Sequence, residues 1–118
     1  MAWFKSKNII KFDWLIINSQ NSYNNAIQMS YSEPILIFKH STRCSISSLA
    51  LRRIESNTEE KSINNCYYLD LLSYRDISNK IADELNVFHA SPQILIIKNG
   101  KCVYHTSHNN ISWKNINI

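Results

Sequence analysis

The length of 118 residues suits one compact domain, and 44% hydrophobic against 19% charged residues exclude an intrinsically disordered chain. The formal net charge of +4 comes from basic residues scattered along the chain, which argues against a nucleic-acid-binding face. The one glycine, Gly100, is too few for a phosphate-binding loop or a dinucleotide-binding motif. We therefore treat residues 1–118 as a single domain with an N-terminal extension at residues 1–13.

The first half of the chain alternates short apolar runs with helical patterns. Residues 14–17 predict an edge strand, and Asn18 or Ser19 can cap a helix that Pro34 ends. Residues 35–38 form a continuous apolar run, typical of a central parallel strand. A polar segment follows, and a second helix is predicted to begin near Cys44 or Ser45, with apolar residues at helical spacing: Ile46, Leu49, Ala50 and Ile54.

The second half continues the alternation. A polar loop at residues 56–65 precedes a second buried strand at residues 66–71. Ser73 and Asp76 have the spacing of a capping box before a third helix. Ser91-Pro92 precedes a strand at residues 93–97, Asn99-Gly100 predicts a two-residue hairpin turn, and residues 102–105 form the returning strand. The tail predicts a short closing helix from about Asn109.

This order of elements predicts an α/β fold that resembles the thioredoxin-like three-layer sandwich, with a mixed central sheet and a cis-proline loop. Parallel crossovers must be right-handed, and the hairpin adds antiparallel strands to a parallel core. The expected order across the sheet is residues 14–17, 66–71, 35–38, 93–97 and 102–105.

Cys44 is the candidate reactive group. It follows a predicted strand and opens a predicted helix, where unpaired backbone N–H groups and the helix dipole favour the thiolate over the thiol. The neighbouring Arg43 adds positive charge, and the polar surroundings argue against a buried cysteine. Cys66 and Cys102 lie inside strand patterns and are expected to be inert thiols.

Pro92 is the second feature that points to a site. Taken alone, a proline at the start of a strand is an ordinary trans residue. In a thioredoxin-like arrangement, however, the proline at this place is cis and its loop faces the reactive cysteine. The backbone of Ser91 would then pair with a substrate strand.

Four segments of the chain resemble the monothiol bacilliredoxins, which are bacillithiol-system redox-active proteins: FKHSTRCSIS (38–47), YLDLL (68–72), YRDISN (74–79) and HASPQ (89–93). The resemblance runs from about Trp14 to Ile116. It implies a thioredoxin-like fold and an oxidoreductase that removes bacillithiol from S-thiolated proteins. Cys44 would be its reactive cysteine and Pro92 its cis-proline.

Ser47 stands where a dithiol oxidoreductase has its second cysteine, so Cys44-Ser-Ile-Ser47 is a monothiol site. Cys44 can attack the bacillithiol sulfur of a mixed disulfide, and an external thiol must then resolve the adduct. Ser47 either donates a hydrogen bond to the Cys44 thiolate or is a solvated hydroxyl group on the first helical turn.

The resemblance also implies an acidic ligand, because bacillithiol carries a malate group with two carboxylates. The basic residues that can pair with it, or that form a solvated basic rim instead, are Lys39, His40, Arg43 and Arg75. His40 is alternatively a proton donor to the departing thiol. The loop residues Ser41 and Thr42, together with Ser91, complete the predicted substrate-binding set.

Two other functions remain open at this stage. Monothiol glutaredoxins with a Cys-x-x-Ser motif carry an iron–sulfur cluster, although this chain has Ser45-Ile46 in place of their Gly-Phe pair. A non-catalytic adaptor that uses only the cis-proline surface is the second alternative.

Three features that the sequence lacks shape our expectations of its cofactors, partners and location. The histidines and cysteines show no zinc-site spacing, so we expect no bound metal or cofactor, with bacillithiol as a co-substrate only. No stretch reaches the ~18 apolar residues of a membrane span, and residues 1–14 lack the apolar core of a signal peptide. We expect a cytoplasmic monomer that acts on S-thiolated proteins and binds neither nucleic acid nor membrane.

The predicted strand directions place both other cysteines at the end of the sheet opposite Cys44. Cys66 begins a strand parallel to the 35–38 strand, and Cys102 follows the distant hairpin turn. We therefore expect neither thiol to resolve the Cys44 adduct, nor the two to pair with each other.

Overall fold

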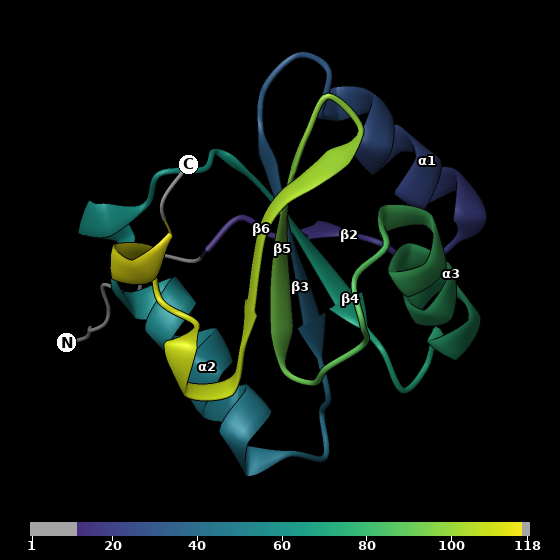
Figure 1. Ribbon diagram of the computed structural model, residues 1–118. Coiled ribbons are helices and arrows are strands. Elements are labelled where there is room, and N and C mark those ends of the chain that lie inside the picture. The colour runs from purple at the N-terminus through teal and green to yellow at the C-terminus, as the bar shows by residue number, and fades with distance from the viewer. Residues whose placement is uncertain (1–11, 117–118) are drawn as a thin grey trace, which may run out of the picture.

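A five-stranded mixed sheet organises residues 12–116, which are the residues that the computed structural model describes (Figure 1). Across the sheet the strands follow the order β2-β4-β3-β5-β6, which confirms the predicted order. β2, β3 and β4 are parallel, whereas β5 runs antiparallel to β3 and to β6. The strands are β2 (Leu15–Ile16), β3 (Ile35–His40), β4 (Asn65–Asp70), β5 (Gln93–Lys98) and β6 (Lys101–Ser107).

Helices cover both faces of this sheet. Helices α1 (Gln20–Met29) and α3 (Arg75–Leu85) pack on one face, and α2 (Ser45–Ser56) packs on the other (Figure 1). None of the helices between residues 12 and 116 is long and apolar enough to cross a membrane. The fold is thus the predicted three-layer α/β sandwich.

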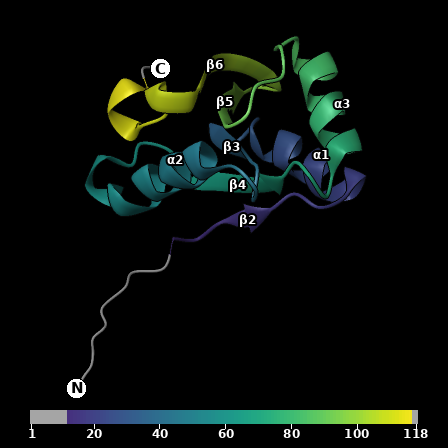
Figure 2. The same ribbon diagram turned by 90° about the horizontal axis from the view of Figure 1, so that it is seen from below.

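The C-terminal segment differs from the expected closing helix. It forms two 3-10 turns, His108–Asn110 and Trp113–Asn115, which pack over α2 (Figure 2). Arg53 on α2 donates hydrogen bonds to the carbonyl oxygens of Ile111 and His108, both at 2.9 Å. Both carbonyl groups belong to the first turn and the residue after it, so Arg53 ties this turn to α2. Residues 1–11 of the expected extension and residues 117–118 lie outside the described residues.

Side chains of the central strands alternate between two apolar clusters. Ile35 and Ile37 face α1 and α3, whereas Leu36 and Phe38 face α2. All four are fully buried. The next two residues, Lys39 and His40, continue the alternation and therefore point to opposite faces of the sheet.

The beginnings of α1 and α3 show how local hydrogen bonds decide helix boundaries. Ser19 caps α1, and Ser19 and Ser22 form a reciprocal capping box. The capping box predicted at Ser73 is wrong, because the Ser73 hydroxyl donates to Asp70 at 3.0 Å and α3 begins only at Arg75. Because its hydroxyl group bonds to Asp70 at the end of β4, Ser73 belongs to the turn before α3 and does not cap the helix.

The predicted apolar face of α2 is only half right. Ala50 and Ile54 are buried as expected, but Ile46 and Leu49 are 47% and 51% exposed. The third buried position is the polar Ser47. Helix α2 is therefore turned so that a hydroxyl group, and not Ile46, faces the end of β3.

The predicted hairpin turn lies at the far end of the sheet. Asn99 and Gly100 both have positive φ angles, 53° and 75°, as a two-residue type I′ turn requires. Ser30 holds this turn, because its carbonyl oxygen accepts from the Asn99 N–H at 2.8 Å and its hydroxyl oxygen accepts from the Gly100 N–H at 2.9 Å. The turn thus sets the first pairs of the hairpin, Lys98 with Lys101 and Ile97 with Cys102, before the register shifts between Ile96 and Ile97.

Replacing Gly100 should weaken the fold at this turn. We expect Gly100→Ala to lower the free energy of unfolding by about 1 kcal/mol, because alanine is strained at positive φ. A Cβ would also meet the Tyr31 ring, but that half-exposed ring can move aside. Urea denaturation should show a smaller loss for Gly100→Asn, since asparagine tolerates this conformation. Wild-type stability for Gly100→Ala would contradict the interpretation.

Candidate active site

Cys44 lies just beyond the C-terminal end of β3 and is the N-cap residue of α2, as predicted. Its backbone N–H donates to the Ser41 carbonyl at 3.2 Å, and its own carbonyl accepts from the Ser48 N–H at 3.1 Å. The side chain makes no capping hydrogen bond and is partly exposed. The sulfur therefore lies at the N-terminus of α2 and is accessible to a reaction partner.

The cis-proline loop, residues 87–92, lies at the same end of the sheet. The Ser91–Pro92 peptide bond is cis, and Pro92 directly precedes β5. Gln93 is paired with Lys39 in the β3–β5 register, which places this loop beside the end of β3 from which the Cys44 loop departs. The structure thus brings together the two features that the sequence singled out.

Ser47 has neither of the roles predicted for it. It is fully buried, so it is not a solvated hydroxyl group. Its Oγ lies 2.7 Å from His40 Nδ1 and accepts a hydrogen bond from the Ser41 N–H at 3.0 Å. No hydrogen bond to Cys44 is formed by this side chain among residues 12–116. Ser47 instead joins the first turn of α2 to the end of β3.

His40 is buried at the end of β3 and is not part of an exposed rim, contrary to the prediction. Its ring packs against Phe38 and Tyr68, with centroids 6.0 and 5.6 Å away. Burial lowers the pKa of His40, against the opposing charges of Asp70 and Glu55. A neutral ring tied to Ser47 is poorly suited to protonate a departing thiol.

Lys39 is also buried, so it too is wrongly placed in the predicted rim. Its Nζ donates to the Ser78 carbonyl at 3.1 Å and lies 3.4 Å from His89 Nδ1. Burial lowers the pKa of Lys39 from 10.5 to about 8. The reason for both errors is that β3 extends to His40, two residues further than its apolar run.

The remaining predicted residues are accessible to different degrees. Thr42, Arg43 and Arg75 are exposed, and Arg75 is the first residue of α3. Ser41 is nearly buried, and Ser91 is partly buried. Of the predicted basic residues, only the two arginines present their charges to solvent.

His89 is a site residue that the predicted set lacks. It belongs to the cis-proline loop and contacts both Lys39 and Ser78. Partial burial of the ring, followed by the charges of Lys39 and Arg75, lowers its pKa. Its position three residues before Pro92, inside the HASPQ segment, is the sequence signal that could have indicated it.

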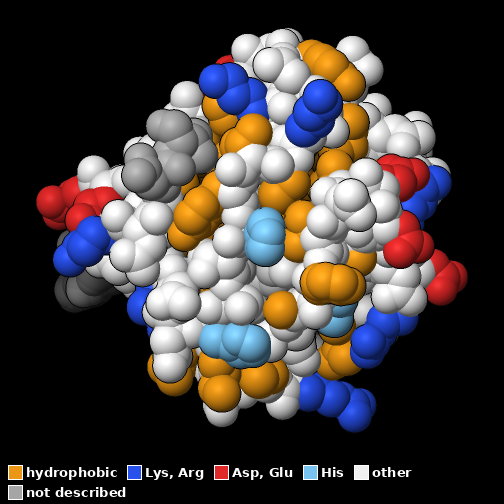
Figure 3. All heavy atoms as spheres, viewed as in Figure 1, with side chains coloured by type: hydrophobic (Ala, Val, Ile, Leu, Met, Phe, Trp, Pro, Cys, Tyr) orange, Lys and Arg blue, Asp and Glu red, His pale blue; other side chains and the backbone are white. Residues whose placement is uncertain are grey.

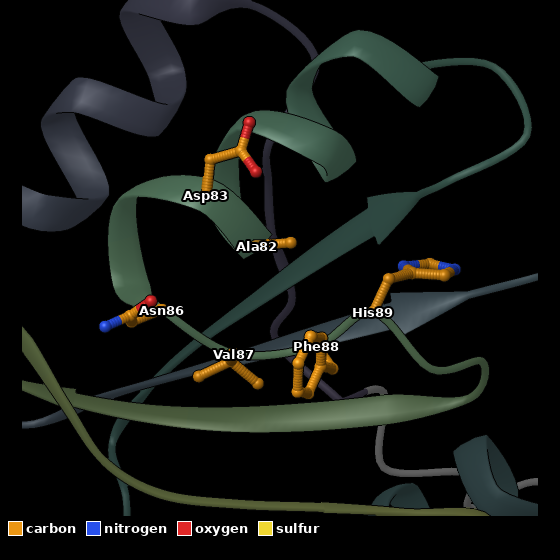
Figure 4. A pocket seen from close by; sticks show the side chains of 6 residues that line it. All are labelled: Ala82, Asp83, Asn86, Val87, Phe88 and His89. Carbon is orange, nitrogen blue, oxygen red and sulfur yellow. The ribbon is translucent and has the colours of Figure 1, made fainter.

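Beside this loop, a hollow of about 410 Å³ opens at the C-terminal end of α3 (Figure 4). Phe88 at its rim is 96% exposed. The hollow is lined by Ala82, Asp83, Asn86, Val87, Phe88 and His89. In Figure 4 the His89 ring points away from the end of α3. The loop thus presents an aromatic and an imidazole side chain next to each other.

Two buried polar atoms near the loop lack a hydrogen-bond partner among the described residues. They are Ser91 Oγ and Gln93 Oε1. The Gln93 amide nitrogen, in contrast, donates to the Phe88 carbonyl at 2.9 Å. Nowhere in residues 12–116 is a group of three His, Cys, Asp or Glu side chains placed to hold a metal ion.

Cys66 and Cys102 lie far from Cys44, as predicted. Cys66 is paired with Leu36 and Cys102 with Ile97, so both are near the start of β3. A strand of six residues spans roughly 17–20 Å, well beyond disulfide reach. Burial raises the pKa of Cys66 to about 12 and also raises the pKa of Cys102. Neither thiol is suited to attack.

Removing these two thiols should leave thiol exchange intact. We expect the Cys66→Ala, Cys102→Ser double variant to release a thiol from a mixed disulfide at the wild-type rate, because neither sulfur reaches the Cys44 adduct. Stopped-flow measurement with an external reductant checks this. A slower resolving step, with the folded state preserved by circular dichroism, would show that one of them takes part.

The buried lysine should give stability a distinct pH dependence. Between about pH 8 and pH 10.5 the unfolded chain retains a proton that folded Lys39 has lost, so this residue's contribution to stability rises with pH over that range. We expect wild type to gain up to about 3 kcal/mol relative to Lys39→Met from neutral pH to pH 10.5. The exposed Lys98→Met is the control. A stability difference that is constant with pH in urea denaturation would contradict the burial argument.

Comparison with known proteins places the chain in a family. The family model described as monothiol bacilliredoxin BrxC matches residues 16–116. A solved candidate oxidoreductase with a thioredoxin fold is similar at 29% identity and a TM-score of 0.75, over 86% of this chain and 88% of that one.

Two thioredoxins resemble the chain in fold alone. A thioredoxin from Nicotiana alata has 18% identity and a TM-score of 0.67, with 87% of each chain covered. The oxidised thioredoxin from Plasmodium falciparum has 14% identity and a TM-score of 0.66, over 87% of this chain and 90% of that one. With the family match over most of its length, the chain belongs to the monothiol bacilliredoxin family.

Proposed function

We propose that this protein is a monothiol thiol–disulfide oxidoreductase that removes bacillithiol from S-thiolated proteins. The observation that carries the proposal is the site itself. A partly exposed cysteine stands at the N-terminus of α2, and the position of a second thiol is filled by a buried serine. Membership of the monothiol bacilliredoxin family supports the same chemistry.

The reaction proceeds in two exchanges at one sulfur. The Cys44 thiolate attacks the bacillithiol sulfur of a mixed disulfide, the old S–S bond breaks, and the substrate protein leaves as a thiolate that takes up a proton. An external bacillithiol thiolate then attacks the Cys44 adduct. Bacillithiol disulfide leaves and the Cys44 thiolate is restored. Over the cycle the substrate cysteine is reduced and two bacillithiol molecules become one disulfide.

The surroundings of Cys44 suit both a low-molecular-weight thiol that carries carboxylates and a protein substrate. Arg43 adjoins Cys44, and Arg75 begins α3. Guanidinium groups bind carboxylates well, so both can pair with the malate group of bacillithiol. At the end of the molecule where β3 passes into α2, at the bottom of Figure 3, apolar side chains lie beside basic ones. Ile46 and Leu49 on α2 offer apolar contact area for a substrate protein.

The proposal extends to the setting of the reaction. Reduced thiols are maintained in the cytoplasm, and there we place this protein, as a monomer without a bound cofactor. The cis-proline loop would hold the substrate strand through the backbone of Ser91.

Intact mass spectrometry tests the function directly. We expect a bacillithiolated test protein to lose its adduct while this protein gains one bacillithiol at Cys44 only. Cys44→Ser should lose all transfer, whereas the Cys66→Ala, Cys102→Ser variant should retain it. Parallel substrates that carry glutathione or coenzyme A measure the preference for bacillithiol.

Two results would overturn the proposal. One is an absence of transfer from every mixed disulfide; the other is an adduct on Cys66 or Cys102. Alkylation of Cys44 at about pH 6 no faster than that of free cysteine would point to a non-catalytic adaptor instead.

A further inference from the structure

Three basic side chains from three elements gather beside the cis-proline loop. Lys39 comes from β3, Arg75 from α3 and His89 from the loop itself. Lys39 touches His89. Arg75 lies one helical turn before Ser78, whose hydroxyl oxygen is 3.5 Å from His89 Nδ1, and the charge of Arg75 acts on that ring. Within residues 12–116 the ion pair that forms, Lys80–Glu84, involves none of the three. The group therefore lacks a counter-charge of its own.

Lys39 determines how the His89 ring is protonated. An ammonium group can only donate hydrogen bonds, so its contact with His89 Nδ1 requires that nitrogen to be the acceptor. The neutral ring must then carry its proton on Nε2. Because Nδ1 faces the buried lysine and the residue is exposed, the Nε2–H is the side of the ring available to a ligand.

The carboxylates nearby do not neutralise this group. Asp83 lines the hollow with His89 (Figure 4), but the two side chains form neither an ion pair nor a hydrogen bond. Asp76 follows Arg75 at the start of α3 and lines a second hollow with it. Neither carboxylate contributes to the shift in the pKa of His89, which partial burial, Lys39 and Arg75 all lower.

We propose that Arg75 and His89 form a carboxylate-binding subsite beside the cis-proline loop, supported from beneath by the buried ammonium group of Lys39. The subsite takes a carboxylate of the low-molecular-weight thiol that occupies Cys44, and this assignment rests on the proposed function. Lys39 is a positioning residue here, because it acts through His89 and touches no ligand.

The chemistry of the three groups fits a carboxylate. A guanidinium fork and an N–H donor supply charge-assisted hydrogen bonds to its two oxygens. A bound anion would also offset the cost of the buried, unpaired charge of Lys39. A neutral thiol gains neither benefit, so the subsite would discriminate between thiols by their charge.

Malate, the dicarboxylic part of bacillithiol, is a direct probe of this subsite. We expect NMR spectra of the histidine rings to show His89 as the Nε2–H tautomer, and malate to raise the pKa of His89 upon binding. Arg75→Gln and His89→Gln should each weaken malate binding about tenfold, as the loss of one charge-assisted hydrogen bond implies. Lys39→Met should give a mixture of His89 tautomers.

Exposed residues away from the loop provide matched controls. His105→Gln on β6 and Arg52→Gln on α2 should bind malate as wild type does. Malate binding that leaves the His89 resonances unchanged would overturn the subsite. The same holds for wild-type malate affinity in Arg75→Gln and His89→Gln, or for equal weakening by the control substitutions.

A kinetic comparison separates this inference from the proposed function. The ratio of kcat/KM for a bacillithiolated substrate to that for a substrate blocked with 2-mercaptoethanol should fall about tenfold in His89→Gln and in Arg75→Gln, mainly through KM. If wild type releases neither thiol, the proposed function fails. If wild type releases both and the ratio is unchanged in the variants, the function stands and the subsite fails.

Discussion

The hydroxyl group of Ser47 holds the first turn of α2 against the end of β3. It bonds to His40 and to the Ser41 N–H inside the protein, where an unpaired donor would cost about 1–3 kcal/mol. The loop of residues 41–44 begins at the Ser41 N–H, which bonds to Ser47, and ends at Cys44, the N-cap of the helix that carries Ser47. Ser47 therefore anchors both ends of the loop that positions Cys44. Ser47 of this monothiol site thus has a structural role, and replacing it with cysteine would weaken its hydrogen bonds to His40 and Ser41.

Periodicity and turn chemistry were sufficient to predict the architecture. The apolar runs located β3 and β5, Ser19 located the start of α1, and Asn99-Gly100 located the hairpin. These signals are local, and each depends on residues that are close together in the chain. The order across the sheet came from the resemblance to the thioredoxin-like sandwich, with which right-handed crossovers and one hairpin agree.

The details of the site depend on contacts that the sequence pattern does not reveal. Lys39 and His40 are polar, and a polar pair after an apolar run is ordinarily the start of a loop. Here Ser78, far away in the chain, is the partner of Lys39, and Ser47, on the next helix, is the partner of His40. These contacts allow both polar residues to stay inside the sheet. His89 was missed for the same reason, since its importance comes from the buried Lys39 and not from its own neighbours in sequence.

The alternation at the end of β3 separates two environments within one site. Lys39 and His40 are adjacent in the chain, yet one ionisable group lies in the layer of α1 and α3 and the other in the layer of α2. The backbone of the sheet separates the two side chains. A substitution beside Lys39 in the α3 layer therefore need not displace the Ser47–His40 contact that positions the loop of Cys44. The residue that prepares the nucleophile and the residue that orients His89 can then change one at a time, although they are neighbours on the same strand.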